Sequence, residues 1–185
     1  MSNFRLKDPD CVFIHIPKTG GSSIRQGLWE GRYDGPEFGR VPDDWAGLFS
    51  FAFVRHPIDR LVSAWSDFRQ LRRYDGDLSA FMDVVEDETI IFDERRSNTP
   101  ERIRHHAIPQ THPFNCLAAA EFIGRHERYT EDVACILEKL ELHAQDLPEE
   151  RKTDRGHWRE HAGSDIVRRA ERYYAKDFEA LGYDV

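Results

Sequence analysis

The sequence predicts an α/β fold with three layers, in which helices cover both faces of a mainly parallel central sheet. Two observations predict it. Short apolar segments rich in β-branched and aromatic residues alternate with segments whose apolar residues recur at helical spacing. Glycines and prolines separate the two kinds of segment. Because the chain has 185 residues, we expect residues 1–185 to form one domain around a single core.

The first strand, turn and helix are predicted near the N-terminus. Residues 11–16 (CVFIHI) predict a buried strand, which ends at Pro17 and a pair of glycines. Ser22 and Ser23 are candidate N-caps for a helix that continues to about Glu30. An irregular connection rich in glycine and proline follows this helix.

The same pattern occurs a second time. Residues 49–54 (FSFAFV) predict another buried strand, and Pro57 suits the first position of the next helix. The apolar residues of this helix recur at three- and four-residue spacing and are Leu61, Val62, Trp65, Phe68 and Leu71. Ligands in such folds bind beyond the carboxyl ends of parallel strands, so both turns are candidate binding loops.

The remaining elements are shorter. The sequence predicts helices over residues 78–85, 99–106 and 164–181, a third strand over residues 121–124, and a helix from Thr130. Residues 148–163 are polar and charged without an apolar period, and they predict a loop or an extended flap.

Composition excludes several classes of function. The formal net charge of -8 argues against general affinity for nucleic acid, because that affinity needs many lysines and arginines against the phosphates. No run of about 18 apolar residues occurs, so the sequence predicts neither a membrane span nor a signal peptide. Cys11, Cys116 and Cys135 are scattered singly, without the paired spacing of a zinc site. We interpret them as reduced thiols of a cytoplasmic protein.

Residues 17–23 (PKTGGSS) form the first candidate phosphate site. Glycines let the backbone approach a phosphate, the helix N-terminus and the hydroxyls donate hydrogen bonds, and Lys18 supplies a full positive charge. The Walker A pattern of nucleoside triphosphatases is absent, because the lysine precedes both glycines. The alternative is a tight turn with an exposed lysine.

The second candidate phosphate site follows the second strand. Arg55 stands at the end of that strand, and Ser63 lies in the second turn of the predicted helix. Arginine offers a planar fork of donors that suits a phosphate, and serine adds a hydroxyl. Asp59 and Arg60 either cap and solvate the first helical turn or take part in the site.

These segments resemble a known family. FIHIPKTGGSSI followed by FAFVRHPIDRLVSAW is similar to the paired 5′-phosphosulfate and 3′-phosphate motifs of the sulfotransferases that use 3′-phosphoadenosine-5′-phosphosulfate (PAPS). The likeness is strongest to the carbohydrate sulfotransferases of the Golgi and their bacterial relatives. FIGRHERYTEDV resembles that family's strand, glutamate and helix, and YYAKDFEALGY resembles its closing helix. Residues 151–158 (RKTDRGHW) are loosely similar to the loop that covers the nucleotide in cytosolic sulfotransferases, or they form an ordinary charged surface loop.

The resemblance implies a fold, a donor and a set of binding residues. The fold is the sulfotransferase fold, which is similar to that of the P-loop NTPases, and the donor is PAPS. Arg55 and Ser63 are implied to hold the 3′-phosphate, although His56 departs from the Asn or Asp more usual after that arginine. The residues implied to hold the 5′-phosphosulfate are Lys18, Thr19, Gly20, Gly21, Ser22 and Ser23.

Sulfuryl transfer requires alignment, stabilisation of charge on the leaving phosphate, and a base for the acceptor proton, with no metal. Lys18 is the candidate for stabilising the charge. His106 is the candidate base, because it precedes a Pro-Gln pair in RHHAIPQTHPF as a histidine does in some relatives; His105 and His112 are its neighbours. Such a histidine is alternatively a surface residue or a local hydrogen-bonding group.

Other basic residues have structural interpretations. His15 alternates with two isoleucines on the first strand, and we interpret it as a packed core residue. Arg69, Arg72 and Arg73 either complement the C-terminus of their helix or bind an acidic or sulfated acceptor.

The residues and the resemblance together predict an enzyme that moves a sulfuryl group from PAPS to a hydroxyl acceptor, which the resemblance implies is a carbohydrate. Its partners are then the nucleotide donor and that acceptor. The alternative is a non-catalytic module that binds PAPS, or the product nucleotide 3′-phosphoadenosine-5′-phosphate (PAP), and has lost its base. A kinase is disfavoured, because the lysine is not where a Walker A motif needs it.

Overall fold

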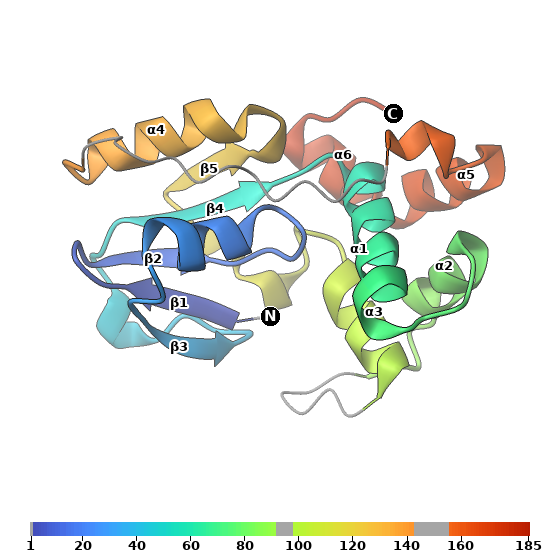
Figure 1. Cartoon of the computed structure of the whole chain (residues 1–185), viewed down its shortest axis with the longest axis horizontal. Coiled ribbons are helices and arrows are strands. Elements are labelled where there is room, and N and C mark those ends of the chain that lie inside the picture. Colours follow the sequence, from blue (N-terminus) through green and yellow to red (C-terminus); the bar gives the residue numbers. More distant parts are fainter. Residues whose placement is uncertain (1, 92–97, 143–155) are drawn as a thin grey trace. The chain divides into compact units, whose positions relative to one another are not determined.

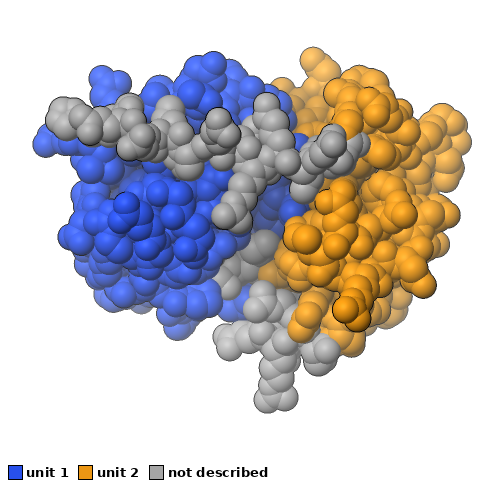
Figure 2. Space-filling model, viewed as in Figure 1, with its two compact units in different colours: residues 1–55, 111–151 blue, residues 56–110, 152–185 orange. Residues whose placement is uncertain are grey.

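A computed structural model describes residues 2–91, 98–142 and 156–185 of the chain. The chain divides into two compact units (Figure 2). Unit 1 consists of Met1–Arg55 and Thr111–Arg151, and unit 2 consists of His56–Gln110 and Lys152–Val185. The assignment of residues 1–185 to one domain stays a prediction.

Unit 1 is built on a five-stranded sheet (Figure 1). The strands are β1 (Ser2–Leu6), β2 (Cys11–Ile14), β3 (Tyr33–Phe38), β4 (Ser50–Val54) and β5 (Phe122–Arg125). Their order is β3-β1-β2-β4-β5. β4 runs parallel to both β2 and β5, whereas β1 runs antiparallel to both β2 and β3. Every strand except β1 therefore points in one direction, and the predicted α/β class with a mainly parallel sheet is confirmed.

The sequence does not predict β1 and β3. β3 contains Gly35 and Pro36, which disfavour a strand, but a strand at the edge of a sheet tolerates proline. Asn3 pairs with Glu37 and Arg5 with Asp34, so Gly35 and Pro36 together face a single residue of β1. This bulge places the two residues that are poorest at strand formation where the pairing is already interrupted.

Unit 1 also contains several helical segments among the residues that the structure describes. They are the π-helix η1 (Ser23–Leu28), the helix α4 (Tyr129–Lys139), and the 3₁₀-helices η2 (Asp43–Trp45), η3 (Pro113–Asn115), η4 (Leu117–Ala119) and η5 (His126–Arg128). Phe51 and Phe53 project from the same face of β4, because side chains alternate along a strand. The ring centroid of Trp29, which ends η1, lies 6.1 Å from that of Phe51. The ring centroid of Tyr129 lies 5.0 Å from that of Phe53, so η1 and α4 share this face.

Unit 2 is helical in the residues that the structure describes. Its helices are α1 (Pro57–Arg72), α2 (Leu78–Glu86), α3 (Thr99–Ala107), η6 (Trp158–Glu160), α5 (Ser164–Tyr173) and α6 (Ala175–Leu181). The predicted single helix over residues 164–181 is wrong, because the structure divides it at Tyr174. The side chain of Tyr174 is fully buried, and its hydroxyl donates to the backbone carbonyl of Ala107 over 2.7 Å. Burial also raises the pKa of this phenol.

Arg60 is a buried capping residue of unit 2. Its side chain is fully buried, and its guanidinium donates to the backbone carbonyls of His106, Ala107 and Ile108. These carbonyls end α3, where a helix has no further amides of its own to bond them. The structure therefore gives Arg60 a structural role, although not the solvation of the first turn of α1 that the sequence suggests.

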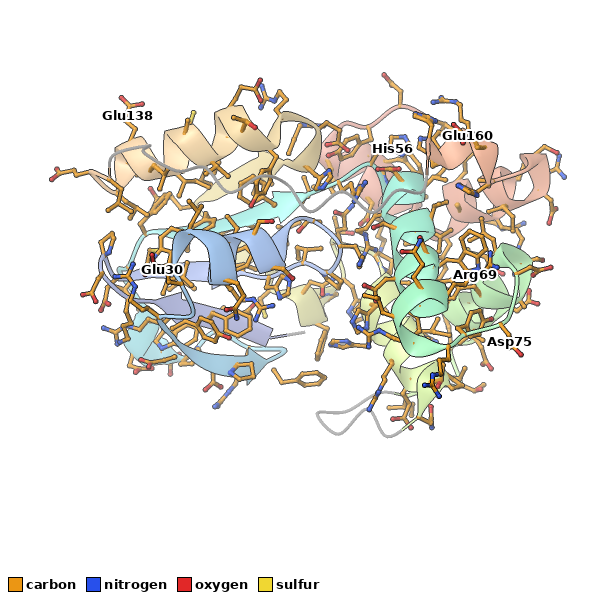
Figure 3. The ribbon with its side chains drawn as sticks, in the orientation of Figure 1. Glu30, His56, Arg69, Asp75, Glu138 and Glu160 are labelled. Atoms are coloured by element: carbon orange, nitrogen blue, oxygen red, sulfur yellow. The ribbon has the colours of Figure 1, made fainter. Side chains whose placement is uncertain are left out.

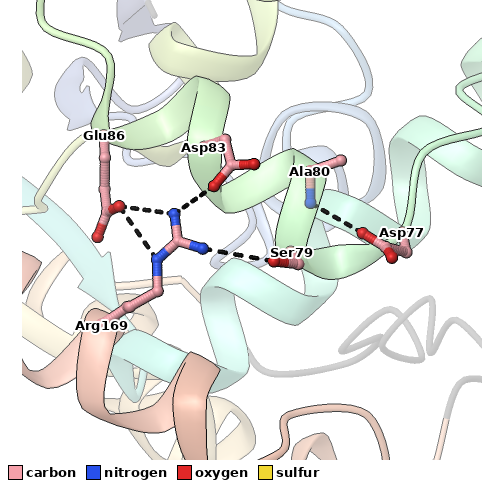
Figure 4. Close-up of polar contacts among 6 residues, drawn as sticks. All are labelled: Asp77, Ser79, Ala80, Asp83, Glu86 and Arg169. Atoms are coloured by element: carbon pink, nitrogen blue, oxygen red, sulfur yellow. Dashed lines mark hydrogen bonds and ion pairs between the residues drawn. The ribbon is translucent and has the colours of Figure 1, made fainter.

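A charged cluster holds α5 against α2 (Figure 4). Arg169 Nη2 lies 2.6 Å from both Asp83 Oδ1 and Glu86 Oε2, and its Nε lies 3.1 Å from Glu86 Oε2. The same guanidinium donates to Ser79 Oγ over 3.4 Å. The hydrogen bond to Glu86 raises the pKa of Arg169, which is the sign expected of a stabilised cation. This side chain thus joins two helices that are far apart in sequence.

Candidate functional site

The segment PKTGGSS forms the turn between β2 and η1, as the sequence predicts (Figure 1). Lys18 has a φ angle of 65° and Gly20 a φ angle of 93°, so the chain reverses through two left-handed residues. The carbonyl of Gly20 accepts from the amides of Ser23 and Ile24, over 3.0 and 3.3 Å, and so starts the helix. Thr19 is fully buried, and its hydroxyl donates to the carbonyl of Ile16 over 2.9 Å.

The predicted capping by serine is wrong. Ser22 is exposed and has helical angles, with a φ of -71° and a ψ of -41°, and its side chain makes no cap hydrogen bond. Ser23 is buried and already belongs to η1. An N-cap needs an extended backbone, and the helix here begins as soon as the chain leaves Gly20. The exposed hydroxyl of Ser22 therefore stands on the surface of the turn.

Arg55 contacts the first candidate site directly. Its Nη1 donates to the backbone carbonyl of Lys18 over 3.2 Å, although the two residues are 37 apart in sequence. The contact arises because β2 and β4 are parallel neighbours, with Ile14 paired to Ala52, so both strands end at the same edge of the sheet. The structure thus brings the side chain of Arg55 to the backbone of Lys18, so the two segments that the sequence singles out are in contact.

The loop after β5 adds residues that sequence reasoning missed. Tyr129 is buried, and its hydroxyl donates to the carbonyl of Gly20 over 3.4 Å. The ring of His126 lies 6.2 Å from the ring of Tyr129. Asp132 is buried and fixes this loop by accepting from the amide of Arg125 over 2.6 Å. The signal for this loop was its position after a predicted strand, because parallel strands end at one edge.

Ser63 and His106 both lie in unit 2. Ser63 is buried on α1, the helix that the sequence predicts for it. His106 lies in the last turn of α3, where Nδ1 is 2.7 Å from the carbonyl of Arg102 and Nε2 is 3.3 Å from Nη2 of Arg72. A carbonyl only accepts, so Nδ1 carries the proton and Nε2 accepts from Arg72. The basic atom of His106 is therefore Nε2, and it already has a partner.

The neighbouring histidines have local roles. His105 is fully buried in α3. Nδ1 of His112 accepts from the amide of Phe114 over 3.2 Å and caps η3. His15 is buried, as predicted, with its ring 5.2 Å from that of Phe13. Sequence reasoning therefore identified His15 as a core residue correctly.

His56 lies at the N-terminus of α1 (Figure 3) and contacts three aromatic rings. Trp158 stacks on its ring at 5.4 Å with an interplanar angle of 15°, and Phe178 and Tyr183 meet it edge to face at 5.7 and 5.6 Å. Nε2 of His56 lies 2.8 Å from the carbonyl of Asp184. Residues 151–155 of the predicted covering loop lie outside the described residues. Trp158, the last residue of that predicted loop, is described and is buried.

The arginines at the end of α1 are exposed, and two of them lie over aromatic rings. The guanidinium carbon of Arg69 is 4.9 Å from the centroid of Trp65, and that of Arg72 is 4.6 Å from the centroid of Phe68. Arg72 also donates to Asp67 Oδ2 over 3.0 Å. Arg73 ends the helix with a left-handed backbone. The positions of Arg69 and Arg72 in the last turn of α1 fit the predicted role of complementing the helix C-terminus.

Two further observations concern the described residues alone. No group of three or more His, Cys, Asp or Glu side chains among residues 2–91, 98–142 and 156–185 has the arrangement of a metal site. Within the same ranges, no helix combines the length and the apolar character that crossing a membrane requires.

Comparison with known proteins identifies the family. The model of the sulfotransferase family matches residues 42–184, which contain Arg55, Ser63 and His106 and begin after the PKTGGSS turn. No curated protein matches the chain. A crystal structure of a sulfotransferase from Alicyclobacillus acidocaldarius is similar at a TM-score of 0.46 and 14% identity, over 77% of this chain and 58% of that one. Because the family model covers well over half of its residues, the chain belongs to the sulfotransferase family.

Proposed function

We propose that the chain transfers a sulfuryl group from PAPS to a hydroxyl group of a carbohydrate. The observation that carries this proposal is the contact between Arg55 and Lys18. Two segments that resemble the two nucleotide motifs of PAPS-dependent enzymes meet at the carboxyl edge of a mainly parallel sheet, which is where such folds bind ligands. Each of these segments carries one positively charged residue, Lys18 or Arg55, and two positive charges suit a doubly phosphorylated nucleotide.

The proposed donor contacts follow the two motifs. Arg55 and Ser63 bind the 3′-phosphate. The turn binds the 5′-phosphosulfate with Lys18, Thr19, Gly20, Gly21, Ser22 and Ser23. Because the hydroxyl of Thr19 donates to Ile16, we propose its backbone amide as the contact to the ligand. The exposed hydroxyl of Ser22 supplies a further donor.

In the proposed reaction, the acceptor oxygen forms a bond to sulfur while the bond from sulfur to the bridging oxygen breaks. Lys18 stabilises the negative charge that develops on the leaving phosphate. His106 takes the acceptor proton at Nε2, the ring atom whose lone pair faces Arg72. No step in this scheme requires a metal.

The experiment that tests the proposal measures transfer of radiolabelled sulfate from PAPS to a panel of neutral and acidic oligosaccharides, phenols and lipids. Transfer to an oligosaccharide is the expected result. Transfer only to phenols or lipids would keep the reaction and remove the carbohydrate acceptor, whose basis is the resemblance of the two motifs to those of carbohydrate sulfotransferases.

A second candidate function is a non-catalytic module that binds PAP or PAPS. The observation in its favour is that Arg72 already occupies Nε2 of the candidate base. Calorimetry with PAP separates the two functions when it is combined with the transfer assay. Binding of PAP without transfer to any member of the panel would favour the module.

We also propose a cytoplasmic location. All three cysteines are free thiols, of which Cys11 is buried and Cys135 is exposed. Free, scattered thiols are usual where the compartment is reducing.

A further inference from the structure

The ring of Tyr129 lies directly against Gly20 in the PKTGGSS turn. A Cβ atom at Gly20 would be 2.6 Å from Cε2 of Tyr129, which is closer than such atoms approach in proteins. The hydroxyl of Tyr129 also donates to the carbonyl of Gly20 over 3.4 Å. That carbonyl starts η1 by accepting from Ser23 and Ile24, so Tyr129 contacts the point at which the turn becomes a helix.

The ring of His15 lies against the next glycine. A Cβ atom at Gly21 would be 2.1 Å from Nε2 of His15 and 2.4 Å from its Cδ2. Gly21 does not have the positive φ of Gly20, so its backbone conformation does not require glycine. A larger residue is excluded at this position by the ring of His15. The two consecutive glycines are thus each covered by one ring, and the two rings come from different parts of the chain.

Both rings are buried and pack against other aromatic side chains. Tyr129 and His15 are only 6% and 8% exposed. The ring of Tyr129 packs at 5.0 Å on that of Phe53, and the ring of His15 stacks at 5.2 Å on that of Phe13. The amide of His15 donates to Oδ1 of Asn3 over 3.2 Å, which ties it to β1 as well. Side chains this well packed keep their positions when a ligand binds.

We propose that His15 and Tyr129 are positioning residues, which hold Gly20 and Gly21 in the conformation that receives the phosphosulfate. The proposal rests on the proposed function, because it assumes that the turn binds the nucleotide. The turn has two left-handed residues and two glycines, and without support it would sample other conformations. Fixing it in advance removes an entropic cost from binding.

The first test replaces Tyr129, whose ring packs against Gly20. Tyr129→Leu should raise the dissociation constant for PAP about 10-fold, because the turn loses its support. Tyr129→Phe keeps the ring and should stay within about threefold of the parent. Val133→Ala is the matched control, since Val133 is fully buried one turn further along α4. It should lower the melting temperature while leaving the dissociation constant unchanged.

The second test is a double-mutant cycle on His15 and Gly21. Gly21→Ala alone should raise the dissociation constant for PAP about 10- to 100-fold, because the new methyl group collides with the imidazole. His15→Ala should raise it less. The double variant should bind PAP no more weakly than His15→Ala, since the methyl group then occupies the space that the ring leaves. Additive effects would overturn the role of His15.

The outcomes separate this inference from the proposed function. If the parent protein binds no PAP, the proposed function fails, and the inference fails with it. If the parent binds PAP and both Tyr129→Leu and His15→Ala bind it equally well, the inference alone is overturned. Weaker binding in both, with amide resonances of Gly20 and Gly21 displaced in the free protein, supports it. Unchanged affinity in Val133→Ala despite its lower melting temperature would separate the role of Tyr129 from a general loss of stability.

Discussion

Arg55 Nη1 donates a hydrogen bond to the backbone carbonyl of Lys18 over 3.2 Å. The bond joins the residue after β4 to the turn that follows β2. Arg55 can therefore act in two ways. It supports the turn in the free protein, and a guanidinium is also a group that suits a phosphate. Loss of Arg55 therefore removes both the proposed contact with the nucleotide and a support of the turn.

Arg55→Ala should raise the dissociation constant for PAP about 10- to 100-fold, as expected for lost hydrogen bonds to a charged group. Calorimetry measures it directly. Arg40→Ala is the control, because Arg40 is an exposed arginine of the same unit that pairs with Glu37. An unchanged constant in Arg55→Ala would rule out the contact with the 3′-phosphate.

Lys18→Ala should lower kcat for sulfuryl transfer about 100- to 1,000-fold, because the charge on the leaving phosphate loses its stabilising partner. The affinity for PAP should fall much less. The ratio of the two effects is the informative quantity, and it comes from steady-state kinetics together with calorimetry. Equal kcat in the variant and the parent would remove Lys18 from the mechanism.

His106→Asn should lower kcat about 10²- to 10⁴-fold while the dissociation constant for PAP stays the same. His112→Asn serves for comparison, since His112 is exposed and caps η3. Full transfer activity in His106→Asn would assign the proton transfer to another group. In that case the bond from Arg72 to Nε2 would be a structural contact of the histidine.

Arg169→Ala should lower the free energy of unfolding by about 1–3 kcal/mol, because Asp83 and Glu86 lose charged hydrogen bonds to a largely buried partner. Arg168→Ala, in which an exposed pair with Asp165 is lost, should cost below about 0.5 kcal/mol. Urea unfolding of both variants gives the comparison. Equal losses would show that the cluster around Arg169 contributes no more than a surface pair.

The thiols of buried Cys11 and exposed Cys135 should differ in their reactivity toward alkylating reagents. Burial raises the pKa of Cys11 to about 12, so almost none of it is thiolate at pH 8, whereas Cys135 is exposed on α4. Iodoacetamide at pH 8, followed by mass spectrometry, should modify Cys135 and leave Cys11 intact. Rapid modification of Cys11 in the folded protein would contradict its burial in the sheet.

Much of the fold can be predicted from the sequence, because its main elements have strong local signals. The strands β2 and β4 are short apolar runs, and Pro57 begins α1 as predicted. The division at Tyr174 could not be predicted, since it depends on a hydrogen bond to Ala107 in another helix. β3 was missed because glycine and proline disfavour a strand, except at an edge with a bulge.

The candidate site was predictable only where its residues follow strands. Arg55 comes directly after β4 and Lys18 lies in the turn that follows β2, and the parallel pairing brings the ends of both strands to one edge. Tyr129 and Gly20 are 109 residues apart, and nothing in the local pattern of either indicates their contact. His15 was predicted as a core residue from its alternation, but its closeness to Gly21 depends on how the turn folds back. Contacts of this kind depend on tertiary structure.

The bulge in β3 also bears on how the protein avoids aggregation. An outermost strand with a full row of free amides and carbonyls recruits strands from other molecules. Pro36 has no amide hydrogen to offer, and the extra residue opposite β1 bends the strand out of a flat ladder. The segment that is hardest to recognise as a strand in the sequence is thereby a poor template for amyloid-like growth along that side of the sheet.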